Sequence, residues 1–315
     1  MLIIKKCKGF INDVKRNKFS YLIALPAIIY VLIFSYFAYP YMVIAFQRYS
    51  YKNHTILGIL TKGEWIGLNN FKFFFASNNA FRVTYNTIFL NILFIITGTF
   101  TAVLLALLLN ETRSVWFVRT SQAIMLFPNY ISWIVVCYIL MALFSNRFGI
   151  VNTMMAKLGI PAINWYTEPE YWPSILVFVR ILKGAGMSAV IYLAAIAGID
   201  TSLNEAARID GANRFQLILN ITLPLITPTV VVLTLLSIGK IMFGDFGMIY
   251  ALVGDNGTLY ETTDIIDTYI FRALRQVGDP SQAMAIGLFQ SVIGFIMVFG
   301  SNRITQLVYP DGALY

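Results

Sequence analysis

The sequence predicts an all-α membrane protein with six transmembrane helices. Hydrophobic residues make up 58% of the 315 residues and charged residues only 12%, whereas soluble domains carry roughly 25% charged residues. A water-soluble core could not bury so much apolar side chain in a chain of this size. Five stretches without any charged residue are each long enough to cross a bilayer as a helix, which takes about 20 apolar residues.

These charge-free stretches place the spans in chain order. Five of them cover residues 19–47, 83–110, 120–146, 215–239 and 281–302. A sixth span, residues 171–199, is equally apolar although it contains Arg180 and Lys183. We predict helices because the short alternating strands of a membrane β-barrel are absent from the sequence pattern. The first stretch is too long for the apolar part of a signal peptide and is interpreted as a retained anchor.

The basic N-terminus predicts the orientation. Residues 1–18 hold six Lys and Arg against one acid, and such a tail stays in the cytoplasm by the positive-inside rule. Six spans then return the C-terminus to the cytoplasm. The predicted organisation is a cytoplasmic tail (1–18), an anchor helix (19–47), an external loop (48–82), a five-span core (83–303) that includes a cytoplasmic loop at 200–224, and a cytoplasmic tail (304–315).

Residue types and motifs argue against several functions. Cys7 and Cys137 are far apart, and His54 is the only histidine, so most metal sites and most His-based acid–base catalysis are disfavoured. No G-x-x-x-x-G-K-[ST] motif occurs, so the chain is not expected to bind ATP through a P-loop. We expect neither a cofactor nor a metal in this chain, and we read its net charge of +8 as membrane orientation rather than nucleic-acid binding.

The cytoplasmic loop at 200–224 is predicted to begin with a short helix. Ser202 and Glu205 have the spacing of a capping box, which starts a helix just after Ser202. Gly211 suits the left-handed position that follows the end of such a helix.

A second short helix is predicted directly after the turn. Asn213 and Gln216 form another capping signal, and Pro224 and Pro228 permit a change of direction before the next span. These residues alone leave two interpretations open. The loop is either a capped connection or a helix that docks into a groove of another protein.

The same loop resembles the EAA loop of permease subunits in binding-protein-dependent ABC importers. That family's pattern is E-A-A, then D-G-A three residues on, then I-x-L-P, and the sequence matches it at Glu205, Ala206, Ala207, Asp210, Gly211, Ala212, Ile221, Leu223 and Pro224. Outside the loop, residues 67–71 and 86–87 are similar to carbohydrate-type permeases. Residues 263–272 and 285–291 resemble the subgroup of these permeases that handles complex carbohydrates.

The resemblance implies a fold, a location and partners. It implies the type I ABC importer permease fold in the bacterial cytoplasmic (inner) membrane, with both termini cytoplasmic. The implied partners are a second permease subunit in a heterodimer, two cytoplasmic ATPase subunits that bind ATP and Mg, and an external solute-binding lipoprotein or periplasmic protein. The implied function is import of an oligosaccharide or related carbohydrate, with ATPase coupling through Glu205, Ala206, Ala207, Asp210, Gly211, Leu223 and Pro224.

Four charged residues are predicted within or near the spans: Arg180, Lys183, Lys240 and Asp245. Charged side chains at membrane depth usually pair or line water-filled paths, and the three-residue spacing of Arg180 and Lys183 places both on one helix face. All four are therefore candidates for the translocation pathway. The alternatives are that Lys240 reaches outward to the interface and that Asp245 neutralises a basic neighbour.

The external segment at 263–275 is predicted to form an amphipathic helix. Its apolar residues share one helical face, namely Ile265, Ile266, Tyr269, Ile270, Ala273 and Leu274. Acidic residues near its start and arginines near its end suit the helix dipole. The opposite, outward face, with Asp264, Asp267 and Arg272, is a candidate contact for the external receptor. The alternative is a helix that only seals the outer mouth.

Three rival functions remain. A permease for a non-sugar solute could carry the same cytoplasmic loop. A self-sufficient ion-coupled carrier would need buried carboxylates and inverted repeats, whereas Asp245 is the single acid predicted at membrane level and the sequence shows no repeat. An intramembrane enzyme would need convergent His, Asp and Ser chemistry, which the sequence lacks.

Overall fold

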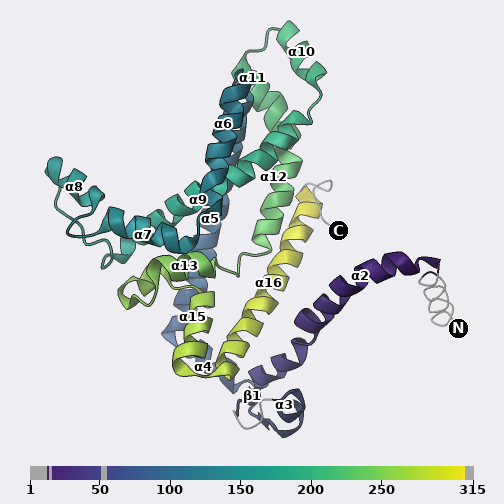
Figure 1. The fold of residues 1–315 in the computed structure, drawn as a ribbon, viewed down its shortest axis with the longest axis vertical. Coiled ribbons are helices and arrows are strands. Elements are labelled where there is room, and N and C mark those ends of the chain that lie inside the picture. Colours follow the sequence, from purple (N-terminus) through teal and green to yellow (C-terminus); the bar gives the residue numbers. More distant parts are fainter. Residues whose placement is uncertain (1–12, 14–15, 51–54, 309–315) are drawn as a thin grey trace.

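The computed structural model describes residues 13, 16–50 and 55–308, and these are mostly helical (Figure 1). Cys7, His54 and most of the predicted N-terminal tail lie outside the described residues. Five helical stretches are long and apolar enough to cross a membrane: Lys18–Phe46, Asn79–Asn110, Pro169–Ala197, Arg214–Ile238 and Pro280–Leu307. A sixth is assembled from two helices, Val115–Tyr130 and Trp133–Phe144. The predicted all-α fold with six spans is confirmed.

The third span is broken, whereas the sequence predicted one continuous helix over 120–146. Its two halves, α6 (Val115–Leu126) and α7 (Trp133–Phe144), meet at 96°. Pro128 lies in a 3₁₀ turn at the end of the first half and cannot donate a backbone hydrogen bond. Ser132 then caps α7 by accepting a hydrogen bond from the Val135 amide, so a new helix starts in a new direction.

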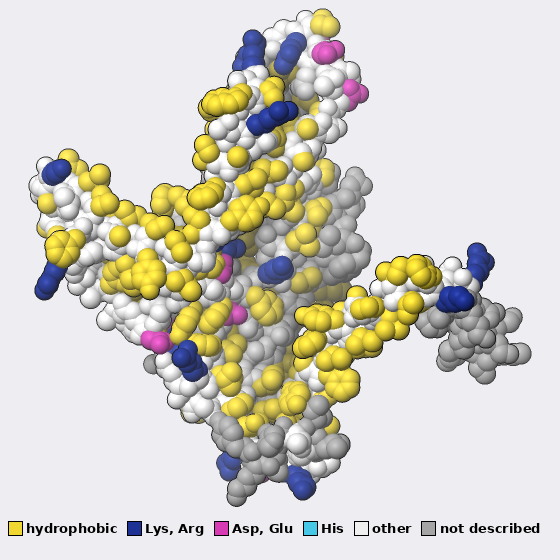
Figure 2. Space-filling view, in the orientation of Figure 1, with side chains coloured by type: hydrophobic (Ala, Val, Ile, Leu, Met, Phe, Trp, Pro, Cys, Tyr) yellow, Lys and Arg dark blue, Asp and Glu magenta, His cyan; other side chains and the backbone are white. Residues whose placement is uncertain are grey.

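The first span departs from the bundle. It begins with α2 (Lys18–Val31) and continues through a π-helical turn (Leu32–Tyr36) and a 3₁₀ segment (Tyr39–Phe46). No residue of α2 is buried, and the helix projects away from the other spans (Figure 1). Hydrophobic side chains cover it (Figure 2).

Small residues bring the central helices together. α5 (Asn78–Asn110) packs along α9 (Trp172–Ala197) through Ala102, Ala106 and Ala189, all fully buried. Without large side chains between them, the two backbones approach closely, as is common in membrane interfaces. Gly186 of α9 touches α6 in the same way, because a Cβ there would overlap the Met125 carbonyl.

The fifth span and the last part of the 200–224 loop form one continuous stretch of helix. α10 (Thr201–Ile209) precedes α11 (Arg214–Leu217), a π-helical turn (Ile218–Thr222) and α12 (Leu223–Ile238). Helix is continuous from Arg214 to Ile238, so Pro224 and Pro228 do not interrupt it. Pro224 lies in the first turn of α12, directly after the π-helical turn, and proline is tolerated better in a first turn than in a helix interior.

Shorter elements close the two ends of the molecule. One end carries α3 (Ile56–Lys62), α4 (Asn69–Phe75) and the two-stranded ribbon of β1 (Gln47–Arg48) and β2 (Glu64–Trp65), and the opposite end carries α10 (Figure 1). The remaining helices are α8 (Ile150–Lys157), α13 (Phe246–Val253), α14 (Tyr260–Thr263), α15 (Ile266–Arg272) and α16 (Pro280–Val308). Charged side chains gather at the α10 end (Figure 2).

Candidate functional site

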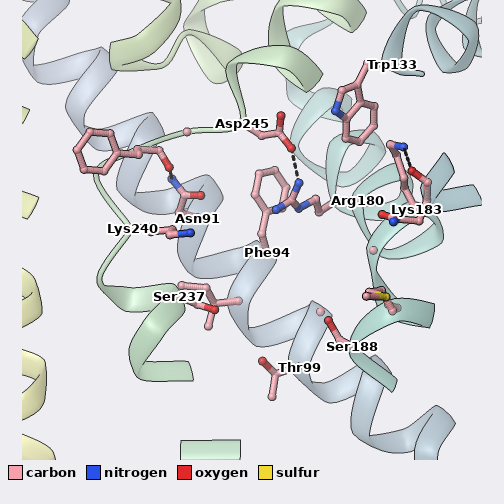
Figure 3. A pocket seen from close by; sticks show the side chains of 18 of the residues that line it. Asn91, Phe94, Thr99, Trp133, Arg180, Lys183, Ser188, Ser237, Lys240 and Asp245 are labelled. Atoms are coloured by element: carbon pink, nitrogen blue, oxygen red, sulfur yellow. Dashed lines mark hydrogen bonds and ion pairs between the residues drawn. The ribbon is translucent and has the colours of Figure 1, made fainter. Parts of the chain in front are cut away.

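A cavity of about 740 Å³ lies between α5, α9, the break after α6 and the stretch between α12 and α13. This volume is in the range of small-molecule sites. All four charged residues predicted for the translocation pathway line it, from two separate parts of the chain (Figure 3). They are Arg180, Lys183, Lys240 and Asp245.

Arg180 and Asp245 form an ion pair across the cavity wall (Figure 3). The Arg180 guanidinium donates to Asp245 Oδ2, and Asp245 Oδ1 accepts a 2.9 Å hydrogen bond from the Met248 amide. Asp245 therefore caps α13 and neutralises Arg180 at once. The sequence had left open that Asp245 neutralises a basic neighbour, and this is the arrangement found.

Lys183 is bound to the backbone of the broken span. Its ammonium donates to three carbonyl oxygens, those of Pro128 (3.3 Å), Asn129 (2.8 Å) and Ile131 (2.5 Å). It also lies 4.9 Å from the centre of the Trp133 ring, close enough for a cation–π contact. A bend at membrane depth leaves carbonyls without helical partners, which is costly unless another group satisfies them. Lys183 supplies that group.

Residues 239–245, called here the 239–245 segment, are non-helical and carry both Lys240 and Asp245. Side chains of three other helices bind the backbone of this segment. Asn91 donates to the Ile241 carbonyl (2.9 Å), Gln290 donates to the Met242 carbonyl (2.7 Å), and Asp267 accepts from the Gly244 amide (2.7 Å). These bonds satisfy backbone groups that no helix satisfies and hold the segment in place.

Lys240 differs from the other charged residues of the cavity. Its side chain is exposed and points into the cavity (Figure 3). Within the described part of the chain, no acidic side chain lies in ion-pair distance of its ammonium and no hydrogen bond to it is found. The alternative that Lys240 reaches outward is not the conformation seen.

The structure corrects the predicted outer helix. α15 begins at Ile266 rather than 263 and ends at Arg272, followed by a π-helical turn. Asp264 is 1% exposed, and Arg272 donates to both of its carboxylate oxygens, at 2.7 and 2.6 Å. The prediction that these side chains form an outward polar face is wrong, because an acid and a base eight residues apart pair inside the chain.

Asp267, the third candidate on that face, also turns inward. Its carboxylate accepts from the Gly244 amide and from the Gln290 side chain (3.2 Å). Burial raises the pKa of the Asp267 carboxyl above its usual value, and these two hydrogen bonds oppose that rise. The side chain therefore links α15 to the 239–245 segment.

Several amide side chains at the site were missed by sequence reasoning. Besides Asn91 and Gln290, Asn86 donates to the Glu261 and Asp264 carbonyls at 3.0 and 3.2 Å. An Asn or Gln inside a long apolar stretch is a signal that could have found them, because a polar amide at membrane depth requires a partner.

The start of α10 is not capped as predicted. The Asp200 carboxylate accepts from the Ser202 amide at 2.9 Å, so the helix begins at Thr201 and Ser202 is not the cap. Aspartate immediately before a helix competes well for this position, because its negative charge also favours the positive end of the helix dipole.

The rest of the loop folds as predicted. Gly211 has φ +83°, and the Ala212 amide bonds back to the Ala207 carbonyl at 2.9 Å, which closes α10 with a left-handed residue. Asn213 and Gln216 form a reciprocal capping box at 2.8 and 2.9 Å.

The loop presents apolar side chains that the described residues do not cover. α10 stands at one end of the molecule (Figure 1) and contains no buried residue. Four of the exposed side chains are large and apolar: Leu203 at 46%, Ile209 at 86%, Phe215 at 69% and Leu219 at 46%. Glu205 is exposed beside them. Such a surface at the end of a membrane protein fits contact with another protein.

Six apolar spans, a polar cavity of solute size between four of them and an exposed helical loop at one end define the class of membrane transport permeases. Among the described residues, no group of three or more His, Cys, Asp or Glu side chains could hold a metal ion. The chain belongs to the family described as the binding-protein-dependent transport system inner membrane component, whose model matches residues 95–310. It is therefore a multi-span inner-membrane permease, as the resemblance of its 200–224 loop implied.

Two proteins of Bacillus subtilis (strain 168) are similar over nearly the whole chain. Protein LplB is 35% identical over 298 residues, which cover 95% of this chain and 92% of LplB. The polygalacturonan/rhamnogalacturonan transport system permease protein YteP is 35% identical over 308 residues, which cover 98% and 94% of the two chains.

Two solved structures share the fold. One is a bacterial ABC transporter involved in the import of the acidic polysaccharide alginate, with a TM-score of 0.86, 34% identity, and coverage of 96% of this chain and 99% of that chain. The other is a bacterial alginate ABC transporter in complex with an alginate pentasaccharide-bound periplasmic protein, with a TM-score of 0.84, 33% identity, and coverage of 94% and 97%.

Proposed function

We propose that this chain is one permease subunit of an ATP-driven importer that passes an oligosaccharide or related carbohydrate into the cytoplasm. The observation that carries the proposal is the 740 Å³ cavity, which polar, charged and aromatic side chains line together. Amides and hydroxyls can bind sugar hydroxyls, and Phe94 and Trp133 offer rings on which a sugar can stack. The names of YteP and of the alginate transporters support a carbohydrate solute.

The proposed complex contains partners that supply energy and solute. A separate ATPase, in two copies, would bind ATP and Mg and receive the α10 loop in a groove. The uncovered Leu203 and Ile209 support this contact, because buried apolar area drives most protein association. A second permease subunit would complete the translocation path, and an external solute-binding protein would deliver the solute, as the periplasmic protein of the alginate complex suggests.

Coupling would be mechanical. A helix fixed in an ATPase groove moves with the ATPase when the two copies close, and the attached spans move as rigid bodies between two packed states. Glu205, Ala206, Ala207, Asp210 and Gly211 lie on or directly after α10, and Leu223 and Pro224 begin α12 within the span that follows. The seven residues thus occupy the junction between the proposed groove and the membrane.

The coupling proposal is tested in proteoliposomes that contain the complete importer. Glu205→Ala should lower solute import and raise the ATP hydrolysed per solute, while the solute affinity of the external receptor stays unchanged. Glu168→Ala is the matched control, because Glu168 is also exposed but lies in the loop before α9. Wild-type import by Glu205→Ala with a normal ATP ratio would contradict the docking role. A wild-type importer that moves a non-sugar solute and no sugar would contradict the carbohydrate class.

A further inference from the structure

The cavity carries more positive charge than its own side chains neutralise. Three cationic side chains and a single carboxylate line it. Arg180 is paired with Asp245, so that pair contributes no net charge. Lys183 is bound by three carbonyls, which are dipoles and leave its charge in place but occupy all three of its donors.

Lys240 is therefore the cation that remains available to a solute. Its neighbours along the 239–245 segment are held by Asn91, Gln290 and Asp267, so the base of its side chain is fixed beside the cavity. Its three donors have no partner within the described residues. An ammonium without a partner at membrane depth is expensive unless water or an anion reaches it.

We infer that the solute is an acidic sugar, with one carboxylate that binds Lys240. The inference rests on the proposed function and narrows it from carbohydrates to uronate-type oligosaccharides. A carboxylate on the ammonium makes charge-assisted hydrogen bonds, which are shorter and stronger than those to a neutral hydroxyl. Asn129, Ser188 and Ser237 also line the cavity and can bind the remaining hydroxyl groups.

The charge arrangement favours a carboxylate over a phosphate. A phosphate monoester carries between about −1.5 and −2 charges near neutral pH and is bound best by clustered arginines. Here the one arginine that lines the cavity is already neutralised by Asp245. A single free ammonium suits one monoanionic carboxylate group of a uronate chain.

Import by the complete wild-type complex in proteoliposomes tests the inference with defined probes. The probes are trigalacturonate, neutral maltotriose and glycerol 3-phosphate, each at a concentration that saturates the external receptor. Lys240→Gln removes the charge and keeps hydrogen-bonding ability, and Lys240→Arg restores the charge. Lys157→Gln removes the same charge from exposed α8, away from the cavity. Size-exclusion chromatography checks that each variant assembles with its partners.

We expect Lys240→Gln to lower trigalacturonate import roughly 10- to 100-fold, the loss that follows from removing a hydrogen bond to a charged group worth about 1.5–3 kcal/mol. Lys240→Arg and Lys157→Gln should import it near the wild-type rate. Wild-type import by Lys240→Gln overturns the inference.

The wild-type complex separates failure of the inference from failure of the proposed function. If the complex imports maltotriose but not trigalacturonate, the inference is overturned and the proposed carbohydrate function is retained. Import of glycerol 3-phosphate alone contradicts both, as does import of none of the three probes.

Discussion

Lys183 shows how a charged residue at membrane depth can satisfy backbone carbonyl groups by hydrogen bonding. Three carbonyls around the bend between α6 and α7 converge on its ammonium. The sequence indicates a charge at membrane depth that must pair or line a water-filled path. The true partners lie more than fifty residues earlier in a stretch with no charge at all, where only the bend makes them available.

Replacement of Lys183 should destabilise the broken span. Lys183→Met keeps much of the apolar stem but leaves three carbonyls unsatisfied, at a cost of about 2 kcal/mol or more. We expect the thermal unfolding midpoint of the purified complex, followed by tryptophan fluorescence, to fall measurably. Lys157→Met on exposed α8 is the control and should leave the midpoint unchanged. An equal midpoint for Lys183→Met would show that water satisfies the carbonyls.

Asp267 gives the site a pH dependence with a defined sign. Burial raises the pKa of its carboxyl above 3.8 in the folded protein, so the folded state holds the proton more tightly than the unfolded state does. Asp267 then contributes its whole stabilisation at pH values below the pKa of the unfolded state. That stabilisation is lost as the pH rises through the higher pKa of the folded state.

Asp267→Asn should remove that decline. The asparagine oxygen can still accept from the Gly244 amide, so the bond to the 239–245 segment is kept while the titration is lost. We expect the difference in unfolding midpoint between the variant and the wild type to shift in favour of the variant as pH rises from about 4 to about 7. A pH-independent difference would mean that Asp267 titrates normally.

At the scale of elements, local signals were the most predictable. Gly211 and the Asn213–Gln216 box are each specified by residues within one turn, so the sequence predicted both. The start of α10 is harder to predict, because Asp200 and Ser202 can both act as the N-cap of the helix. Asp200 is the residue that caps it. The bend between α6 and α7 was missed because charge-free length gives no information about direction.

The solute import of Gly211 variants should follow how well each residue tolerates the left-handed backbone conformation, and not the size of its side chain alone. Nothing lies within 4 Å of a Cβ built at this position, so the cost is the left-handed conformation itself, about 1–2 kcal/mol for an ordinary residue. Gly211→Asn should import solute best, then Gly211→Ala, then Gly211→Val, because asparagine tolerates this conformation and β-branched residues do not. Gly211→Pro, whose φ is fixed near −65°, should abolish coupling. Normal import by Gly211→Pro would contradict the proposed docking.

At the scale of the whole molecule, the number and order of spans followed from hydropathy alone. Their arrangement did not. The stretch that contains α2 is as apolar as the other spans, yet it leaves the bundle. Asp264 and Arg272 looked like surface charges because they suit a helix dipole, and only the folded chain shows that they are buried together. Composition predicts the environment of a span, and contacts between distant residues decide its neighbours.

The predicted orientation can be tested by labelling from outside. Thr258 is exposed in the turn at Gly257–Leu259 and is predicted to be external, whereas Ser202 on α10 is predicted to be cytoplasmic. In a variant without Cys7 and Cys137, Thr258→Cys should react with a membrane-impermeant thiol reagent in intact cells. Ser202→Cys should react only after permeabilisation. The reverse pattern would invert the topology.

The 239–245 segment also has a thermodynamic consequence. It carries Lys240 and Asp245 into the cavity, and through Gly244 it is bonded to Asp267 of α15. A movement of α15 can therefore displace residues of the cavity wall through one hydrogen bond and a short stretch of backbone. The membrane-spanning helices need not move. Linkage between two sites is reciprocal. If a ligand bound at α15 changes the affinity of the cavity for its solute by some factor, the bound solute changes the affinity of α15 for that ligand by the same factor.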